Sequence, residues 1–298
     1  MVDTCWGCFF GLFQHHRFVR LDSLRHKLEG INEDARPHGL KPRIEICVRD
    51  ENRQLMAAGC VHIGNGVVQT LPSKPAQAIS CPADGTPNAH AKYSRTFFCV
   101  ANVHTYAAAV AMGESCILNQ AHASIPGGHY LDGAFAQEED LCRLLPQLYD
   151  SLDASRDLYP ILPAMVLFTP ALACVRKLGS YELCSSQGEC SVISAAMPQW
   201  GNKPISPDWV STVTLRVRAV LHAAKLSGLP NLVLGSWGCG KFGNDPSEVA
   251  SIFRAQLASQ EFRGAFKHVV FAIRDPQGPN PLSGRKIAAF QNRMEGLR

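Results

Sequence analysis

The sequence predicts an α/β fold in which a largely parallel sheet is covered by helices on both faces. From residue 95 to residue 273, short apolar runs alternate with segments of helical periodicity. This alternation is typical of parallel strands that are joined by helices. The runs are apolar throughout, as expected for strands that are buried on both faces. No run reaches the ~18 apolar residues that a transmembrane helix requires.

The predicted elements follow one another along the chain with little intervening sequence. Trp209, Val213 and Val217 recur at helical spacing and predict an amphipathic helix. Strands are expected at residues 95–100, 116–118, 165–168, 192–195, 232–234 and 268–273, and helices at residues 105–112, 208–226 and 246–259.

A segment rich in proline and small residues, 71–87, precedes most of these elements and is expected to form a loop. The loop separates an opening segment from the alternating pattern. We therefore expect two parts. Residues 1–90 would form an N-terminal extension, partly helical and loop-rich, that packs on the core, and residues 91–298 would form the main domain.

The composition is that of an ordinary globular protein. The 298 residues are 46% hydrophobic and 18% charged, with a net charge of +4, which excludes disordered and fibrous classes. This thin positive charge gives no reason to expect a nucleic-acid partner. Twelve cysteines without a recognisable secretory signal indicate free thiols in a reducing compartment. We therefore expect an intracellular protein, cytoplasmic or nuclear.

A glycine-dense loop follows the predicted strand at 232–234. Four glycines fall within residues 235–243, and Asp245 then marks a helix start as its N-cap. Glycines let backbone amides approach phosphate oxygens, and a helix start favours an anion. The spacing also matches a P-loop, but Phe242 stands where a Ser or Thr should bind Mg²⁺. A tight turn without a ligand is the remaining alternative.

A second glycine turn follows the predicted strand at 116–118. It contains Gly127 and Gly128, and the acids Glu138 and Glu139 follow at a helix start. The helix dipole alone accounts for acids at this position. Alternatively, a carboxyl group beside a glycine-lined pocket can protonate a leaving oxygen and then activate water at an oxocarbenium-like carbon. Burial would help to keep one such carboxyl protonated near neutral pH.

Several segments carry a family pattern in a consistent order. Pro126-Gly127-Gly128-His129 is followed by Gln137-Glu138-Glu139, and Leu118-Asn119 precedes both; residues 192–198 and 234–245 match as well. Together they resemble the microbial-type poly(ADP-ribose) glycohydrolases of the macrodomain superfamily. Their signature is a triple-glycine turn followed by Gln-Glu-Glu. Weaker similarity extends from about residue 103 to about residue 276.

The resemblance implies a three-layer α/β/α macrodomain with a central mixed, largely parallel sheet. It implies that Glu139 protonates the departing ribose hydroxyl and then serves as the base for water, while Glu138 hydrogen-bonds the ribose. Phe242 would pack on the distal ribose, and the loop around it would hold the diphosphate. The residues implied to bind ADP-ribose are Asn119, Gly127, Gly128, His129, Gln137, Gly238, Cys239, Gly240, Lys241, Phe242 and Gly243. Neither a metal nor a cofactor is implied.

Two positions depart from the family pattern. His129 replaces the third glycine of the turn, and Gln120 replaces a usual phenylalanine. Both glutamates and the whole diphosphate loop are retained, so our hypothesis is that His129 changes which ADP-ribosyl linkage is accepted. The alternative is that its side chain simply points to solvent.

The activity implied by the resemblance is hydrolysis of O-glycosidic ADP-ribosyl linkages, with poly(ADP-ribose) on modified macromolecules as the first substrate. The alternatives are a reader that binds ADP-ribose without cleaving it and a hydrolase for mono-ADP-ribose on protein or nucleic acid. Nucleic acid enters only as an ADP-ribosylated substrate. We expect a monomer without a membrane span.

Two cysteine patterns lie outside this scheme or at its edge. Cys5-x-x-Cys8, followed by His15-His16, has ligand types that suit zinc, with redox activity, acylation or plain free thiols as alternatives. Cys239 lies near a helix start that could lower its pKa, and we expect a packing role first and redox sensitivity second.

Overall fold

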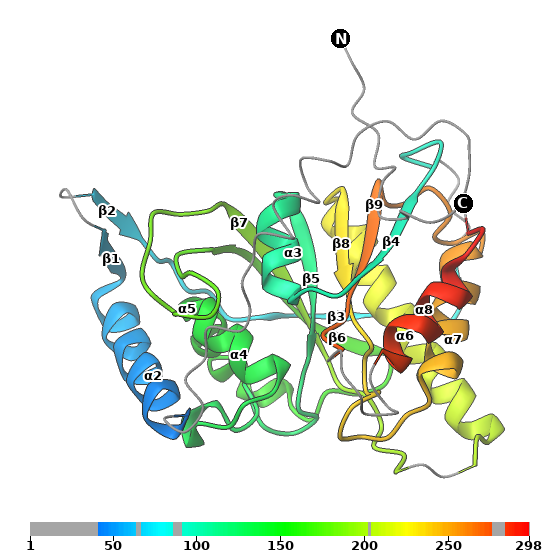
Figure 1. Ribbon diagram of the computed structural model, residues 1–298, viewed down its shortest axis with the longest axis horizontal. Helices are drawn as coiled ribbons and strands as arrows, with labels where there is room; N and C mark the ends of the chain where they lie inside the picture. Colours follow the sequence, from blue (N-terminus) through cyan, green and yellow to red (C-terminus); the bar gives the residue numbers. More distant parts are fainter. Residues whose placement is uncertain (1–40, 64–66, 86–90, 202–203, 276–283, 298) are drawn as a thin grey trace.

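A seven-stranded sheet forms the centre of the protein (Figure 1). The computed structural model describes residues 41–63, 67–85, 91–201, 204–275 and 284–297. The strand order is β3-β6-β7-β5-β8-β9-β4. Neighbouring strands from β7 to β4 run parallel, whereas β6 is antiparallel to both β3 and β7. The sheet is therefore mixed and largely parallel, as predicted. The strands are β3 (Gln77–Ser80), β4 (Phe97–Ala101), β5 (Ser115–Gln120), β6 (Met165–Ala173), β7 (Glu189–Ala195), β8 (Asn231–Leu234) and β9 (His268–Ala272).

Helices cover both faces of this sheet and complete a three-layer α/β/α architecture (Figure 1). Leu232 and Leu234 belong to one core cluster and Val233 to the other, because successive strand residues point to opposite faces. The first cluster is covered by α6 (Pro207–Ser227), α7 (Pro246–Ala258) and α8 (Arg285–Met294), and the second by α3 (Thr105–Met112), α4 (Gln137–Leu144) and α5 (Pro146–Asp153). Two 3-10 helices, η1 (Tyr130–Asp132) and η2 (Arg156–Leu158), lie in the connections.

The three helices expected from the sequence are all present. Helix α3 has the expected bounds, and α6 and α7 differ from the expected ranges by at most one residue at each end. Ser206 caps α6 by accepting a hydrogen bond from the amide of Trp209, and Gly228 ends that helix in the left-handed conformation. The predicted strands are all present, with bounds that differ by up to five residues.

The chain before residue 91 contributes directly to the architecture. It forms α2 (Lys41–Ala58), the hairpin β1 (Cys60–Ile63) and β2 (Val67–Thr70), and then β3. The expectation of a continuous loop at 71–87 is therefore wrong at β3, which pairs with β6 along the edge of the sheet. Most residues of β3 are exposed, so this edge strand lacks the apolar run that marks a buried one. The division of the chain at residue 91 stays a prediction.

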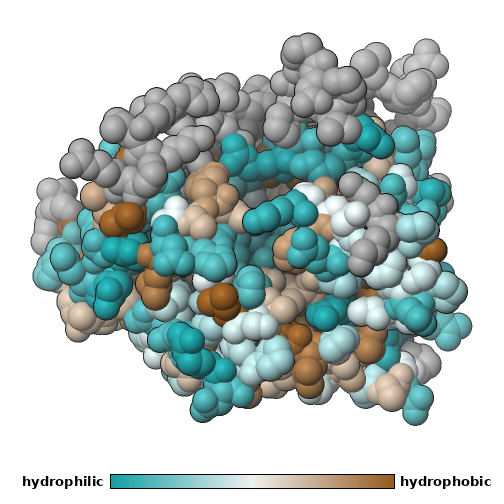
Figure 2. Space-filling model, turned by 90° about the horizontal axis from the view of Figure 1, so that it is seen from below, coloured by the Kyte–Doolittle hydropathy of each residue, from teal (hydrophilic) through white to brown (hydrophobic). Residues whose placement is uncertain are grey.

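The surface mixes polar and apolar residues. Figure 2 shows apolar residues scattered among hydrophilic ones on the face that it views. Single exposed apolar side chains such as Leu162 and Leu226 are ordinary features of protein surfaces. Within the described residues, no helix is long and apolar enough to cross a bilayer.

Candidate active site

The two predicted glycine loops follow the carboxyl ends of two neighbouring strands, β5 and β8. Strands β5 and β8 are parallel neighbours, with Cys116 paired to Leu232, so their carboxyl ends lie together. The second loop begins against the end of β5, because a Cβ atom placed on Gly235 would lie 3.0 Å from Nε2 of Gln120. Segments more than a hundred residues apart are thus brought into one site at the edge where ligands of α/β sheets bind.

Gln137 fixes the start of α4 against the end of β5. Its Oε1 accepts a hydrogen bond from the amide of Gln120 at 2.8 Å, and its Nε2 donates to the carbonyl of Leu118 at 2.9 Å. Both polar atoms of this predicted ligand-binding residue therefore contact the protein. The arrangement supports a positioning role for Gln137, since it sets where the next two residues lie.

Glu138 is a buried carboxyl group beside β5. It is 3% exposed. Its Oε1 accepts a hydrogen bond from Nδ2 of Asn119 at 3.2 Å, and its Oε2 accepts one from the amide of His122 at 2.7 Å. Burial raises the pKa of Glu138 to about 8 despite these two hydrogen bonds, and the nearby charge of Glu139 adds to the rise. Glu138 is therefore largely protonated at neutral pH.

Glu139 is held by two backbone amides. Its Oε1 accepts a hydrogen bond from the amide of His129 at 3.0 Å, and its Oε2 accepts one from the amide of Ala136 at 3.0 Å. The residue is 6% exposed. The second of these bonds is half of a capping box at the start of α4. One carboxylate thus both caps its own helix and faces the glycine turn.

The glycine turn lies directly against the carboxyl groups of Glu138 and Glu139. A Cβ atom on Gly128 would lie 2.5 Å from Oε1 of Glu139 and 2.9 Å from Oε2 of Glu138. A Cβ atom on Gly127 would lie 2.7 Å from Cδ2 of Tyr149. Both glycines have positive φ angles, +67° and +58°, a conformation that side chains rarely adopt. The chain therefore needs glycine at both positions.

His129, at the third position of the turn, occupies an ordinary backbone conformation. Its φ angle is −99°, so no steric reason demands glycine there. The side chain is 55% exposed, and its Nδ1 lies 3.1 Å from Oδ2 of Asp132. Its ring also makes an edge-to-face contact with His122 at 5.9 Å. The departure from the triple-glycine pattern therefore leaves the backbone contact with Glu139 intact.

The glycine-dense loop at residues 235–243 is folded around Asn244. This buried side chain donates from Nδ2 to the carbonyl oxygens of Gly238 and Pro198, both at 3.0 Å, and accepts at Oδ1 from Nε1 of Trp209 at 2.9 Å. Asn244 is a positioning residue that the sequence reasoning missed. Its signal in the sequence was its place directly before the N-cap Asp245, which is confirmed as the cap of α7.

The tip of this loop, residues 240–242, is partly exposed to solvent. Within the described residues, the amides of Gly240, Lys241 and Phe242 donate no hydrogen bond to the protein, and Gly240 and Lys241 are exposed. Such amides are available to an anion. The expectation that the helix start lowers the pKa of Cys239 is wrong: burial raises it to about 12. Cys239 packs against the core, as its expected primary role requires.

A second layer of buried polar contacts fixes α4 from behind. His104 caps α3 by accepting the amide of Tyr106 at Nδ1, so its Nε2 carries the proton that contacts Asp140 at 2.8 Å. The hydroxyl of Tyr181 also donates to Asp140. The sequence gives no signal for this anchoring role of Asp140.

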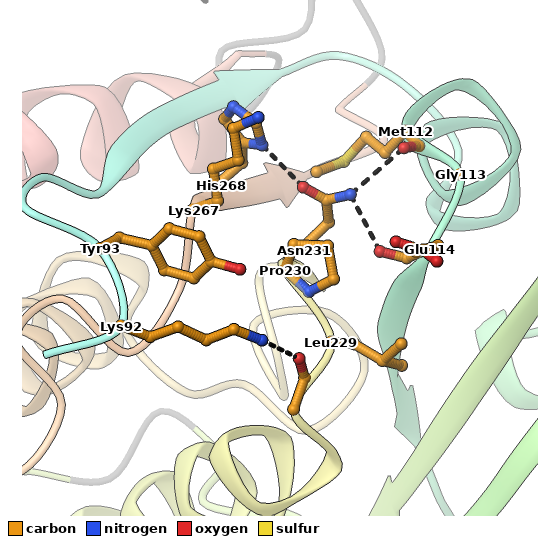
Figure 3. Close-up of a pocket in the computed structure, with 11 residues that line it drawn as sticks. Lys92, Tyr93, Met112, Gly113, Glu114, Leu229, Pro230, Asn231, Lys267 and His268 are labelled. Atoms are coloured by element: carbon orange, nitrogen blue, oxygen red, sulfur yellow. Dashed lines mark hydrogen bonds between the residues drawn. The ribbon is translucent and has the colours of Figure 1, made fainter. Parts of the chain in front are cut away.

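A separate cavity lies at the amino-terminal ends of β8 and β9, at the other end of these strands from the glycine loops (Figure 3). It has a volume of about 770 Å³, and its walls include Lys92 and Tyr93 as well as Asn231 and His268, the first residues of β8 and β9. Asn231 links this wall to the turn after α3 by donating to the carbonyl of Glu114 at 2.9 Å. None of the predicted site residues lines this cavity.

The fold and the paired loops define a macrodomain-like α/β protein. Residues 55–165 match the family model described as microbial-type PARG, catalytic domain, where PARG is poly(ADP-ribose) glycohydrolase. The resemblance seen in the sequence is therefore confirmed. No curated protein matches the sequence.

Solved structures of bacterial poly(ADP-ribose) glycohydrolases share the fold. The Thermomonospora curvata enzyme is 27% identical, with a TM-score of 0.69, over 84% of this chain and 98% of that one. The same enzyme has been solved with the inhibitor ADP-HPD. The Deinococcus radiodurans enzyme in complex with ADP-ribose is 28% identical, with a TM-score of 0.59, over 94% of this chain and 99% of that one.

Proposed function

We propose that this protein hydrolyses O-glycosidic ADP-ribosyl linkages and that poly(ADP-ribose) is its first substrate. The observation that carries the proposal is the packing of Gly128 against both carboxylates, with the amide-lined loop at the same sheet edge. This arrangement occurs in a chain that matches the microbial-type PARG family model. A carboxylic acid beside an anchored sugar is the requirement for glycoside hydrolysis by this route.

The loop at residues 238–243 would bind the substrate through its diphosphate. The free amides of Gly240, Lys241 and Phe242 would donate to phosphate oxygens. The ring of Phe242 would pack on the distal ribose, as the resemblance implies. Oδ1 of Asn119 is buried without a hydrogen-bond partner in the described residues and would accept a hydrogen bond from a ribose hydroxyl, since a buried polar atom without a partner is costly.

Glu139 would transfer the protons of the reaction. In the first step it gives a proton to the ribose oxygen that leaves, while the bond between that oxygen and the anomeric carbon breaks. In the second step it takes a proton from water, whose oxygen bonds to the same carbon. Protonated Glu138 would donate a hydrogen bond to the ribose, and its pKa near 8 supports this role. The assignment of proton transfer to Glu139 rests on the resemblance.

Exposed residues beside the carboxyl groups would determine which substrate is accepted. Hydrolysis of polymer on modified macromolecules fits an exposed His129 at the turn, and this residue would set which linkage is accepted. A reader of ADP-ribose and a mono-ADP-ribosyl hydrolase remain the alternatives to a polymer hydrolase. We propose that the protein acts as an intracellular monomer, and that nucleic acid is bound only when it is ADP-ribosylated.

The test is release of free ADP-ribose from labelled poly(ADP-ribose). Wild-type protein should release it, Glu139→Gln should lower the rate by ~10²-fold or more, and ADP-ribose affinity should stay within tenfold by calorimetry. Glu248→Gln, at the start of α7, is the matched control and should keep full activity. Binding without release would support a protein that reads ADP-ribose without cleaving it. Release only from mono-modified substrates would support a mono-ADP-ribosyl hydrolase. If Glu138→Gln abolishes turnover while Glu139→Gln does not, the roles of the two residues are reversed.

A further inference from the structure

Three side chains that suit a metal ion converge outside the candidate active site. The ligand atoms of Cys81, His222 and Glu261 all lie within 4.8 Å of one another. Cys81 directly follows the edge strand β3, His222 lies on α6, and Glu261 follows α7. The proposed hydrolysis uses none of these residues, so the cluster has no explanation in that reaction.

The cluster is largely shielded from solvent, with His222 half-buried, and is close to the dimensions of a zinc site. Cys81 is 7% exposed, and the side chain of Glu261 is 11% exposed. Bond lengths of ~2.0–2.3 Å to tetrahedral zinc separate its ligand atoms by ~3.3–3.6 Å. A contraction of at most ~1–1.5 Å would therefore bring the three ligand atoms to coordination distance.

Contacts around the cluster hold its frame in place. The amide of Cys81 donates to the carbonyl of Ala164 at 2.7 Å, and Lys225 donates to the carbonyl of Glu261 at 3.0 Å. Nε of Arg218 lies 2.7 Å from Oε2 of Glu261, whereas its Nη2 lies 3.3 Å from Oε1. Oε1 is therefore the less tightly held carboxylate oxygen and is the one left for an ion.

We propose that Cys81, His222 and Oε1 of Glu261 bind a zinc ion, with water in the fourth position. A thiolate, an imidazole and a carboxylate are all zinc ligands. On binding, the thiol of Cys81 loses its proton to solvent, so each ion releases one proton. The thiolate and the carboxylate balance the charge of the ion. Arg218 and Lys225 stay as positive neighbours, which limit the affinity.

Such an ion would have a structural role. It would tie the edge of the sheet, where β3 ends, to the helical layer of α6 and α7. Burial raises the pKa of Cys81, with Arg218 opposing the rise and Glu261 adding to it. Because the thiol must ionise, zinc affinity rises with pH.

The experiment uses the full chain with Cys5→Ser and Cys8→Ser, because those two cysteines carry the other zinc-like pattern of the sequence. Titration of metal-free protein with Co²⁺ should give one equivalent of binding and a thiolate-to-cobalt absorption band that Zn²⁺ abolishes. Zinc should also raise the melting temperature. Adding Cys81→Ser should remove the band and weaken zinc binding by at least ~10-fold.

Cys116→Ser is the matched control, since Cys116 is a buried free cysteine of the same core cluster. It should keep the band and the zinc affinity. Loss of all stoichiometric binding in the Cys5→Ser, Cys8→Ser background overturns the proposal, and so does a band that survives Cys81→Ser. If Cys81→Ser fails to fold, His222→Gln and Glu261→Gln decide the matter: unchanged zinc affinity in both also overturns it.

Discussion

At the scale of single residues, adjacent positions of one turn obey different constraints. Gly128 has a positive φ angle and no room for a side chain, whereas His129 has an ordinary φ angle and an exposed side chain. Both positions contact the carboxyl group of Glu139. Gly128 packs against its Oε1, and the amide of His129 donates a hydrogen bond to the same oxygen. Substitutions at the two positions should therefore have opposite outcomes.

Gly128→Ala should abolish hydrolysis and weaken ADP-ribose binding. The new Cβ atom would lie 2.5 Å from Oε1 of Glu139, so either the turn or the carboxylate must move, and the φ angle adds ~1 kcal/mol or more of strain. His129→Ala is the control and should keep turnover on at least one ADP-ribosyl substrate. Turnover and calorimetry on both variants check this. Equal activity of Gly128→Ala and wild type would contradict the geometry of the turn.

Glu138 should make stability depend on pH. Its pKa is raised from 4.5 to about 8, so between these values the folded state keeps a proton that the unfolded state has lost. The unfolding free energy therefore falls as pH rises through this window, by at most ~1.4 kcal/mol per pH unit from this group, and the fall ends above pH 8. Glu138→Gln should show a shallower fall. Urea unfolding of both proteins from pH 5 to pH 8 measures the difference, and parallel curves would count against the assignment.

At the scale of elements, the glycine-dense loop at residues 235–243 depends on one side chain, that of Asn244. Asn244→Ala would leave Nε1 of Trp209 and the carbonyl of Pro198 without this partner, and the carbonyl of Gly238 would keep only the backbone amide of residue 244. We expect a loss of ~1–3 kcal/mol in unfolding free energy and at least tenfold weaker ADP-ribose binding. Asn231→Ala, at the amino-terminal end of β8, is the control: it should lose comparable stability but keep ADP-ribose affinity. Similar affinity losses in both variants would refute a local role for Asn244.

The elements differ in how visible they are in the sequence. Helix α6 has apolar residues at helical spacing, and α3 and the central strands are dense in apolar residues, so their positions follow from the sequence. Strand β3 lies at the edge with mostly exposed residues, and its composition resembles a loop. The glycines and glutamates of the site were predicted because their chemistry is local. Asn244 and Asp140 were missed because their partners lie far away in sequence, and only the folded chain brings them together.

At the scale of the whole molecule, helix α2 is hydrogen-bonded to α4, the helix that carries Glu138 and Glu139. Asn52 on α2 is 2% exposed, donates to the carbonyls of Cys142 and Arg143, and accepts from the guanidinium of Arg176. These contacts join α2 to α4 and to the chain after β6. No pattern in the sequence specifies them, nor does it specify the strand order, because both depend on contacts between distant segments.

Removal of this segment should therefore weaken the fold. A chain that begins at residue 91 would lose α2 and β3, leaving Arg176 buried without Asn52 and the edge of β6 unpaired. We expect it to unfold at a lower urea concentration than a chain that begins at residue 41, and to bind ADP-ribose more weakly. Unfolding curves and calorimetry on the two chains test this. Equal stability would show that residues 91–298 fold independently, as the predicted division requires.

The backbone of His129 has a broader consequence for variation in this protein. Its φ angle suits any residue except proline, and the hydrogen bond to Glu139 comes from the main-chain amide, which only proline lacks. The side chain at position 129 can thus be varied while the hydrogen bond from its amide to Glu139 is kept. A saturation library at this single codon, screened against several ADP-ribosylated targets, is the most direct route to new selectivity.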